Sequence, residues 1–221
     1  MELAKLLGIH PGVTAIIGGG GKTTLLRTLG EELAEENRVL LCTTTKIFPF
    51  PALPCATTAE ALDSREHRLL CAGTPVPGTE KLTAPPVPMA ELASRFDYVL
   101  VEADGSAQRP LKAHAAHEPV IPAEAGQVIC VVGASGFGRH VSEAAHRPEL
   151  YARLAGVSVE DTAAPETEAA VLRAEGLHHR IYVNQVEAPP ALAASKALAA
   201  LLDCPVLAGS LHRREYFVCS S

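Results

Sequence analysis

The sequence predicts an α/β protein with a doubly wound, mostly parallel sheet, and three observations lead to this fold class. Apolar segments rich in β-branched residues recur along the chain. They are nearly continuous in hydrophobicity, as expected for strands that are covered on both faces. Segments with helical periodicity separate them, and this alternation is typical of a three-layer α/β/α arrangement.

The elements follow in order along the chain. The predicted strands are 13–17, 38–42, 97–102, 127–132, 180–184 and 205–209, and the predicted helices are 23–36, 89–96, 148–155, 166–175 and 190–202. An irregular, proline-rich insert at about 48–88 contains one more strand-like piece, "RLLCAG". No internal repeat is present, and 221 residues fit a single domain over the whole chain.

Composition limits the possible partners. A hydrophobic content of 48% with 20% charged residues is that of an ordinary globular protein. The net charge of −6 argues mildly against nucleic acid as a partner. No apolar run approaches the ~20 residues of a membrane span, and the N-terminus is too short and polar for a secretory signal. We therefore expect a cytoplasmic protein without a nucleic-acid or membrane partner.

The chain has six cysteines, at positions 42, 55, 71, 130, 204 and 219, and none forms a CxxC pair. Three of them, at 42, 71 and 130, lie inside apolar runs. We expect reduced, mostly buried thiols. A thiol with a chemical role is the alternative at Cys55 or Cys219, whose surroundings are less regular.

The stretch "IIGGGGKTT" follows the first predicted strand and opens the first predicted helix. Gly18, Gly19, Gly20 and Gly21 would let backbone N–H groups converge on phosphate, and the helix N-terminus adds partial positive charge. Lys22 would reach the β- and γ-phosphates as a catalytic cation, and the hydroxyl of Thr23 would bind Mg²⁺, with Thr24 next in the same nucleotide-binding segment.

The strict pattern GxxxxGK[ST] requires a glycine where this chain has Ile16, so the turn has to begin at Gly18. The alternative is a flexible loop with an incidental lysine, but such a loop does not need the aliphatic run before it or the amphipathic run after it.

A phosphate-binding loop predicts an acidic metal ligand at the end of a neighbouring strand. "DYVLVEADGS" supplies Glu102 and Asp104, which share one face if the strand continues. Two carboxylates suit Mg²⁺, and Asp104 would orient a water or act as a catalytic base. The alternative is that Asp104-Gly105 begins a turn.

Further polar residues follow the strands at the carboxyl edge, where ligands bind in this architecture. Thr44, Thr45 and Lys46 in "CTTTKIFP" would bind a γ-phosphate, its metal or an anionic substrate, although threonine also favours strands in general. In the long loop after Glu102, Arg109 and Lys112 would clamp an anion.

Histidines accompany these basic residues. His114, His117 and Glu118 have the spacing of a ligand cluster, but a transition-metal site needs more than this, so a solvated loop or substrate contacts are expected. A later glycine-rich loop places four more basic residues toward the same edge: Arg139, His140, His146 and Arg147.

"VNQVE" places Asn184 and Glu187 just after a predicted strand. It is a degraded form of the NKxD sequence with which GTP-binding proteins hold guanine, with Gln for Lys and Glu for Asp. Asn184 and Glu187 are therefore candidates for base binding, and both ATP and GTP stay open.

Together these pieces resemble the YqeC family, regarded as accessory proteins of selenium-dependent molybdenum hydroxylases. The matching pieces are "GGGGKTT", "TTTKI", "VEADGSAQRPLKAHAAHEPVIP", "HRPE" and "VNQVE". The resemblance implies a nucleotide-binding protein that helps to mature a cofactor containing selenium and molybdenum. It implies a molybdenum hydroxylase apoprotein or a cofactor-assembly protein as a partner, and it assigns no particular reaction.

In general shape the chain also looks like the P-loop class that includes dethiobiotin synthetase and the metallochaperone GTPases. Because that class often works as a dimer, a homodimer is a candidate assembly, which the sequence alone does not decide. One subgroup carries a second signature lysine at the position of Ile17, and this chain lacks it.

The leading interpretation is an Mg²⁺-dependent ATP- or GTP-binding NTPase or phosphoryl-transfer enzyme that assists maturation of the hydroxylase cofactor. One rival is a small-molecule kinase or ATP-dependent ligase. The other is a GTP-switched, metallochaperone-like binding module with slow turnover.

Overall fold

The computed structural model describes residues 3–220, and these group into two compact units. Each unit is assembled from segments that are discontinuous in the sequence. The first contains the chain up to Ile16, Thr23–Gly105 and Val120–Gln127; the second contains Ile17–Lys22, Ser106–Pro119 and the chain from Val128 onward. Organisation as a single domain stays a prediction.

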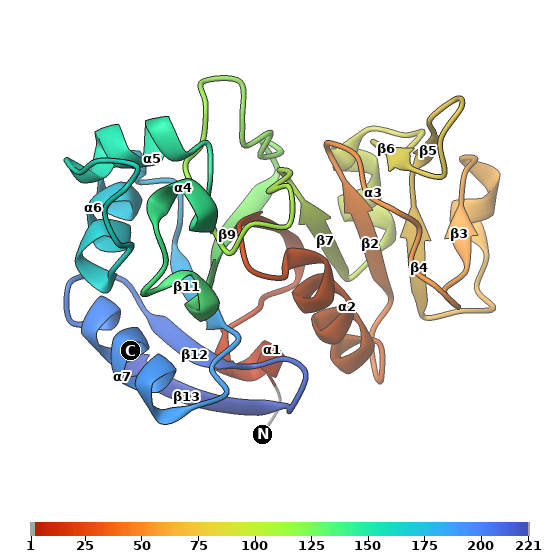
Figure 1. Cartoon of the computed structure of the whole chain (residues 1–221). Helices are drawn as coiled ribbons and strands as arrows, with labels where there is room; N and C mark the ends of the chain where they lie inside the picture. Colours follow the sequence, from red (N-terminus) through yellow and green to blue (C-terminus); the bar gives the residue numbers. More distant parts are fainter. Residues whose placement is uncertain (1–2, 221) are drawn as a thin grey trace. The chain divides into compact units, whose positions relative to one another are not determined.

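The main strands of the first unit are all parallel and lie in the order β1-β7-β2-β4-β3. Figure 1 labels the last four of them, β7, β2, β4 and β3. Their bounds are β1 (Gly12–Gly18, up to Ile16 in this unit), β2 (Val39–Thr43), β3 (Cys55–Ala56), β4 (Leu69–Ala72) and β7 (Tyr98–Glu102). The register pairs Ile16 with Glu102 and Glu102 with Thr43, so three strands bring their carboxyl ends together.

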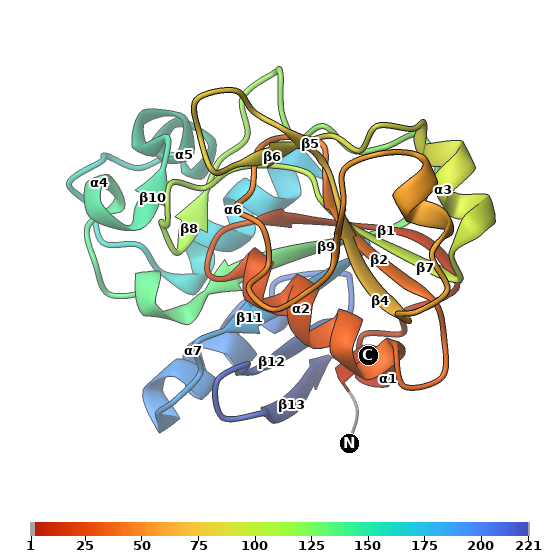
Figure 2. The same ribbon diagram turned by 90° about the vertical axis from the view of Figure 1, so that its right-hand side faces the viewer.

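Helices cover both faces of these strands. Leu40, Cys42 and Val99 pack in one cluster with Leu92 of α3 (Met89–Arg95). Leu41 points the other way, because adjacent strand residues alternate in direction. It lies close under α2 (Lys22–Leu33), where a Cβ on Gly30 would be 2.8 Å from its side chain. Figures 1 and 2 show α2 and α3 on opposite faces accordingly. A short helix, α1 (Leu3–Leu6), precedes β1.

The proline-rich insert has more structure than the sequence predicts. The strand-like piece is β4, as predicted, and the insert adds β3, the 3₁₀ helix η1 (Glu60–Asp63) and the small antiparallel pair β5 (Thr74–Pro75) and β6 (Leu82–Thr83).

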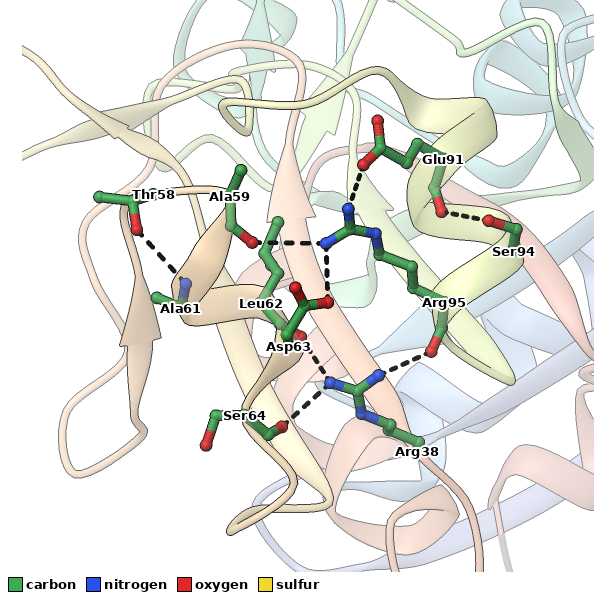
Figure 3. A network of polar contacts seen from close by, with 10 residues as sticks. All are labelled: Arg38, Thr58, Ala59, Ala61, Leu62, Asp63, Ser64, Glu91, Ser94 and Arg95. Carbon is green, nitrogen blue, oxygen red and sulfur yellow. Dashed lines mark hydrogen bonds and ion pairs between the residues drawn. The ribbon is translucent and has the colours of Figure 1, made fainter.

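Two arginines clamp the connection between β3 and β4 (Figure 3). Arg38 donates to the carbonyls of Leu62 (2.5 Å) and Ser64 (3.0 Å), and its guanidinium lies 4.3 Å from the Phe96 ring centroid. Arg95 donates to Asp63 Oδ1 at 3.0 Å. Burial, followed by the nearby charge of Arg65, lowers the pKa of Arg38. The connection is therefore held at several main-chain positions.

In the second unit the strands lie in the order β9-β11-β12-β13. They are β9 (Ala125–Gly133, from Val128 in this unit), β11 (Arg180–Asn184), β12 (Val206–Ser210) and β13 (Glu215–Ser220), of which only β13 is antiparallel to its neighbour. A separate two-stranded sheet joins β8 (Leu111–Lys112) to β10 (Ala145–His146). The helices are η2 (Ala134–Gly136), α4 (Val141–Ala144), α5 (Pro148–Ala155), α6 (Pro165–Glu175) and α7 (Pro189–Ala199).

A buried carboxyl group joins α5 to α6. The Tyr151 hydroxyl donates to Glu168 Oε2 at 2.8 Å, and both side chains are nearly inaccessible to solvent. Burial raises the pKa of Glu168 to about 8 because the charged form is disfavoured away from water. Glu168 is thus largely protonated near neutral pH.

The predicted fold class is confirmed: the strands are mostly parallel, and helices alternate with them along the chain. Every predicted strand and helix is present, with ends displaced by at most a few residues. The sequence did not predict the short strands or the C-terminal antiparallel strand β13.

Candidate functional site

The loop between β1 and α2 has a backbone that favours glycine. Gly18, Gly20 and Gly21 have φ values of +97°, +60° and +112°. Residues with a side chain rarely adopt these values, whereas glycine adopts them readily. Three of the four consecutive glycines are therefore explained by backbone conformation alone.

Neighbouring backbone gives a second reason for the glycines. A Cβ on Gly19 would lie 2.3 Å from the Pro110 carbonyl oxygen, and one on Gly20 would lie 2.4 Å from the Gly133 nitrogen. From the sequence, the glycines are expected to allow close approach by phosphate. The structure adds that the protein's own main chain already approaches Gly18, Gly19 and Gly20 too closely for a side chain.

Two amides of the loop have protein acceptors. Gly19 donates to the Val131 carbonyl at 2.8 Å, and Gly20 donates to the Arg109 carbonyl at 3.2 Å. These bonds set the path of the loop.

The Lys22 side chain folds back over its own loop. Its Nζ donates to the Gly18 carbonyl at 2.7 Å, and the residue is only 4% exposed. The ammonium group is therefore held above the glycines and not extended into solvent.

Asn184 braces the loop from the end of β11. Its Nδ2 donates to the Gly20 carbonyl at 2.7 Å, and its Oδ1 accepts from the Leu211 N–H at 3.2 Å. Glu187 is exposed and accepts from the Ser210 hydroxyl at 3.1 Å. Both residues thus make contacts within the protein, and binding of a base by them stays a prediction.

Thr23 and Glu102 meet at the predicted metal position. The Thr23 hydroxyl donates to Glu102 Oε2 at 2.7 Å, although 79 positions separate the two residues. Glu102 ends β7 and is 7% exposed. The Thr43 hydroxyl donates to the Glu102 carbonyl at 2.7 Å and so holds that end of the strand. The structure therefore brings together the hydroxyl and the acid that the sequence assigned to Mg²⁺.

Asp104 follows after the strand has ended, because β7 stops at Glu102. Glu102 and Asp104 therefore do not share the face of one strand, contrary to the expectation from the sequence. Asp104 is nevertheless fully buried. A carboxyl group at 0% exposure requires local compensation by other groups.

The threonines after β2 mostly bind main chain. The Thr44 hydroxyl donates to the Val120 carbonyl at 2.7 Å, and the Thr45 N–H donates to the Thr43 hydroxyl at 2.9 Å. Lys46 is exposed. These contacts shape the turn, and binding of a substrate by Thr44, Thr45 or Lys46 stays a prediction.

Arg109 and Lys112, the two basic residues predicted to clamp an anion, lie in different environments. The Lys112 side chain is fully buried, with its Nζ 3.2 Å from Glu118 Oε1, and Arg147 Nε lies 2.8 Å from the same oxygen. Burial opposes ionisation of Glu118, but the hydrogen bond from Arg147 and the charge of Lys112 outweigh it and lower the pKa. Lys112 is thus part of an internal ion pair, whereas Arg109 is exposed and donates to the Glu143 carbonyl.

The histidines of this segment take part in the same packing. His114 Nδ1 lies 2.7 Å from Glu175 Oε2. The main-chain N–H of His114 donates to Oε1 of the same carboxylate at 2.6 Å. His117 Nε2 lies 3.3 Å from Arg147 Nη2. Within residues 3–220, no three or more His, Cys, Asp and Glu side chains are grouped so as to hold a metal ion. The cluster of His114, His117 and Glu118 is therefore not a metal site of that kind.

Comparison with known proteins identifies the family. A family model described as YqeC protein matches residues 14–149, which is more than half of the chain. The chain belongs to the YqeC family. A YqeC relative from Escherichia coli (strain K12), named "Uncharacterized protein YqeC", is 35% identical over 167 residues. The match covers 69% of this chain and 64% of that relative, so the chain spans less than two thirds of the relative's length.

The YqeC match includes only part of the candidate site. The glycine loop, Glu102, Asp104 and the Lys112–Glu118–Arg147 ion pairs fall inside 14–149, whereas Asn184 and Glu187 lie beyond it. Across the described portion of this YqeC chain, none of the helices combines the length and the apolarity that crossing a bilayer requires.

The support of the glycine loop by Asn184 is not visible in the sequence. Asn184 is paired in register with Gly133, and both end their strands next to the glycine loop in the second unit. The sequence offers a polar residue after each strand, but it does not give the order of the strands. That order decides which polar residue reaches the loop.

Proposed function

We propose that this chain binds an Mg²⁺–nucleoside triphosphate with Gly18–Thr24 and cleaves its terminal phosphoanhydride bond. The observation that carries the proposal is the 2.7 Å hydrogen bond between the Thr23 hydroxyl and Glu102 Oε2. It joins the residue after the loop lysine to an acid that ends a buried parallel strand. A glycine loop followed by a helix, together with such an acid, is the arrangement of P-loop NTPases.

The residues fit Mg²⁺ by their donor set. Thr23 and Glu102 offer oxygen atoms only, and Mg²⁺ prefers carboxylate, hydroxyl and water oxygens. When bound, the ion would neutralise charge on the β- and γ-phosphates. Thr23 and Glu102 would hold it, directly or through water.

Lys22 would bind the phosphates electrostatically. It already lies over the loop on the Gly18 carbonyl, and a γ-phosphate would compete for its ammonium group. Asp104, fully buried two positions after Glu102, would orient the attacking water or accept its proton. Removing one such preorganised charge-stabilising group typically costs about 10²–10³-fold in turnover.

The wider role rests on family membership and on the resemblance described above. We place the activity in maturation of a selenium-dependent molybdenum hydroxylase cofactor, with the hydroxylase apoprotein or a cofactor-assembly protein as the partner. The two contacts of the Asn184 side-chain amide are made within the protein and so do not distinguish one base from another. ATP and GTP therefore both remain candidate nucleotides.

The proposal is tested by measuring nucleotide turnover and nucleotide-dependent stabilisation in parallel. A ligand that binds only the folded state raises apparent stability by RT ln(1 + [L]/Kd). We expect ATP or GTP with Mg²⁺ to raise the Tm of the wild-type protein. Lys22→Ala should lower turnover by ~100-fold or more, and Glu102→Gln should abolish the dependence of the Tm shift on Mg²⁺.

Lys196→Ala is the matched control, since Lys196 is an exposed lysine on α7. It should behave as wild type in both assays. Unchanged hydrolysis in Lys22→Ala, or a Tm that no triphosphate alters in the wild-type protein, would rule the proposal out.

Phosphate release distinguishes hydrolysis from transfer to an acceptor. If nucleotide consumption exceeds phosphate release only when a candidate acceptor is present, the protein is a phosphotransferase. If phosphate is released in step with nucleotide consumption, but only when an acceptor is present, the protein is a ligase. If turnover is slow and nucleotide controls association with a hydroxylase apoprotein, the protein is a nucleotide-switched chaperone.

A further inference from the structure

Two cysteines face each other across the last pair of strands in the first unit. The short strand β3 pairs in parallel with β4, and the register places Cys55 opposite Cys71. Directly paired residues on neighbouring strands are about 4.8 Å apart, which lies within the Cα separation of about 4.4–6.8 Å found in disulfides. The Cα spacing expected from this pairing therefore lies within the range found in disulfides.

The two side chains point to the same face. Ala56, Leu70 and Ala72 belong to the core cluster that also contains Leu92 of α3. Because strand residues alternate in direction, Cys55 and Cys71 point away from that cluster and toward the other face. Cys55 is exposed, whereas Cys71 is 1% exposed. One thiol is thus accessible to solvent, and the other is almost fully shielded from it.

The thiols also interact electrostatically. A hydrogen bond with Cys71 lowers the pKa of Cys55 to about 7, and the same bond, followed by burial, raises the pKa of Cys71. Burial alone raises the pKa of Cys42 to about 12. Since thiolates and not thiols are the nucleophiles, Cys55 is suited to attack first at neutral pH.

The segment that connects the two cysteines is fixed. Arg38 holds the carbonyls of Leu62 and Ser64, and Arg95 holds Asp63 and the Ala59 carbonyl, the latter at 3.3 Å (Figure 3). These residues lie between Cys55 and Cys71 in the sequence. The clamp keeps β3 beside β4, so closing a bond between the cysteines needs little rearrangement.

We infer that Cys55 and Cys71 form a redox-active dithiol that low-molecular-weight disulfides oxidise to an intramolecular disulfide. The Cys55 thiolate attacks one sulfur of the oxidant, whose S–S bond breaks and releases one thiol after protonation. The Cys71 thiol then loses its proton to solvent and attacks the Cys55 sulfur, releasing the second thiol. Two protein thiols are oxidised, and one small disulfide is reduced to two thiols.

The inference is independent of the proposed nucleotide chemistry, and peptide mapping of the wild-type protein tests it directly. The protein is incubated with glutathione disulfide, alkylated and digested with trypsin without reduction. Cleavage after Lys46, Arg65, Arg68 and Lys81 separates the two cysteines into peptides 47–65 and 69–81. We expect these two peptides to be joined, and the six thiols titrated after denaturation to fall to four.

Two variants separate the steps. Cys71→Ser should stop the reaction at a stable glutathione adduct on Cys55, and Cys55→Ser should leave the thiol at position 71 unmodified. Cys204→Ser is the control, because Cys204 lies on another part of the chain, and in this variant peptides 47–65 and 69–81 should still become joined. A wild-type protein in which Cys55 stays reduced, carries a lasting glutathione adduct, or links to a different cysteine would overturn the inference.

Discussion

The side-chain amide of Asn184 lies 2.7 Å from the Gly20 carbonyl and also accepts the N–H of Leu211 at 3.2 Å. One residue at the end of β11 thus ties the glycine loop to the segment after β12. The same residue is the sequence-based candidate for recognition of a nucleotide base. The two roles predict different behaviour when the amide is removed.

For Asn184→Ala we expect a loss of about 1–3 kcal/mol in the free energy of unfolding, because a buried donor and a buried acceptor lose their partner. Since the loop loosens as a whole, ATP and GTP should lose affinity by similar factors. Urea denaturation and nucleotide titrations measure the two effects. The exposed Glu187 supplies a control, and Glu187→Ala should change stability by no more than ~0.5 kcal/mol. Selective loss of one nucleotide in Asn184→Ala would instead establish base recognition.

Gly19→Ala tests the packing of the loop. The added Cβ would lie 2.3 Å from the Pro110 carbonyl oxygen, which is main chain and cannot rotate away. Overpacking of this kind costs about 1–3 kcal/mol or more, so the midpoint of urea denaturation should fall clearly. Gly126→Ala is the matched control, because nothing lies within 4 Å of its Cβ position. Equal stability of the two variants would contradict the close approach of Pro110.

Glu168 predicts a pH dependence of stability. Its folded pKa of about 8 lies above the ordinary value of 4.5, so between these values the folded protein holds one proton more than the unfolded chain. The free energy of unfolding should therefore fall as pH rises from about 4.5 to about 8, by at most ~1.4 kcal/mol per pH unit.

The Glu168→Gln variant retains an acceptor oxygen for the Tyr151 hydroxyl but cannot ionise. Its free energy of unfolding should vary less with pH over this range than that of the wild-type protein. The difference in free energy of unfolding, variant minus wild type, should be most favourable to the variant at pH 8. Glu166→Gln, on the exposed side of the same helix, should follow the wild-type curve. Chemical denaturation at several pH values supplies the measurement. Parallel curves for Glu168→Gln and wild type would show that this carboxyl group is ionised in the folded state.

The fold class could be predicted from the sequence because long, buried parallel strands are visible as continuous apolar runs. Short strands such as β3 and β8 have only two residues each, so they leave no periodicity to detect. β13 was missed for a different reason: its Phe217 and Val218 are exposed, and the strand is defined by its pairing with β12 and not by burial.

The candidate site could be predicted in part. The sequence pattern assigns Thr23 and Glu102 to one Mg²⁺ ion, which is consistent with their contact in the structure, whereas their binding of that ion stays a prediction. Lys112 shows the limit, because a basic residue in a polar loop gives no sign that Glu118 and Arg147 enclose it. The pairing of Cys55 with Cys71 depends on strand register, which distant residues determine together.

The bond from Lys22 to the Gly18 carbonyl has a consequence for the speed and selectivity of any binding event. A free lysine side chain samples many rotamers, and fixing it usually opposes association. Here folding has already immobilised the ammonium group. In the proposed function, a triphosphate would therefore meet a lysine that is already fixed, so ordering this side chain would not oppose binding again, and its charge would favour an anion over a neutral molecule.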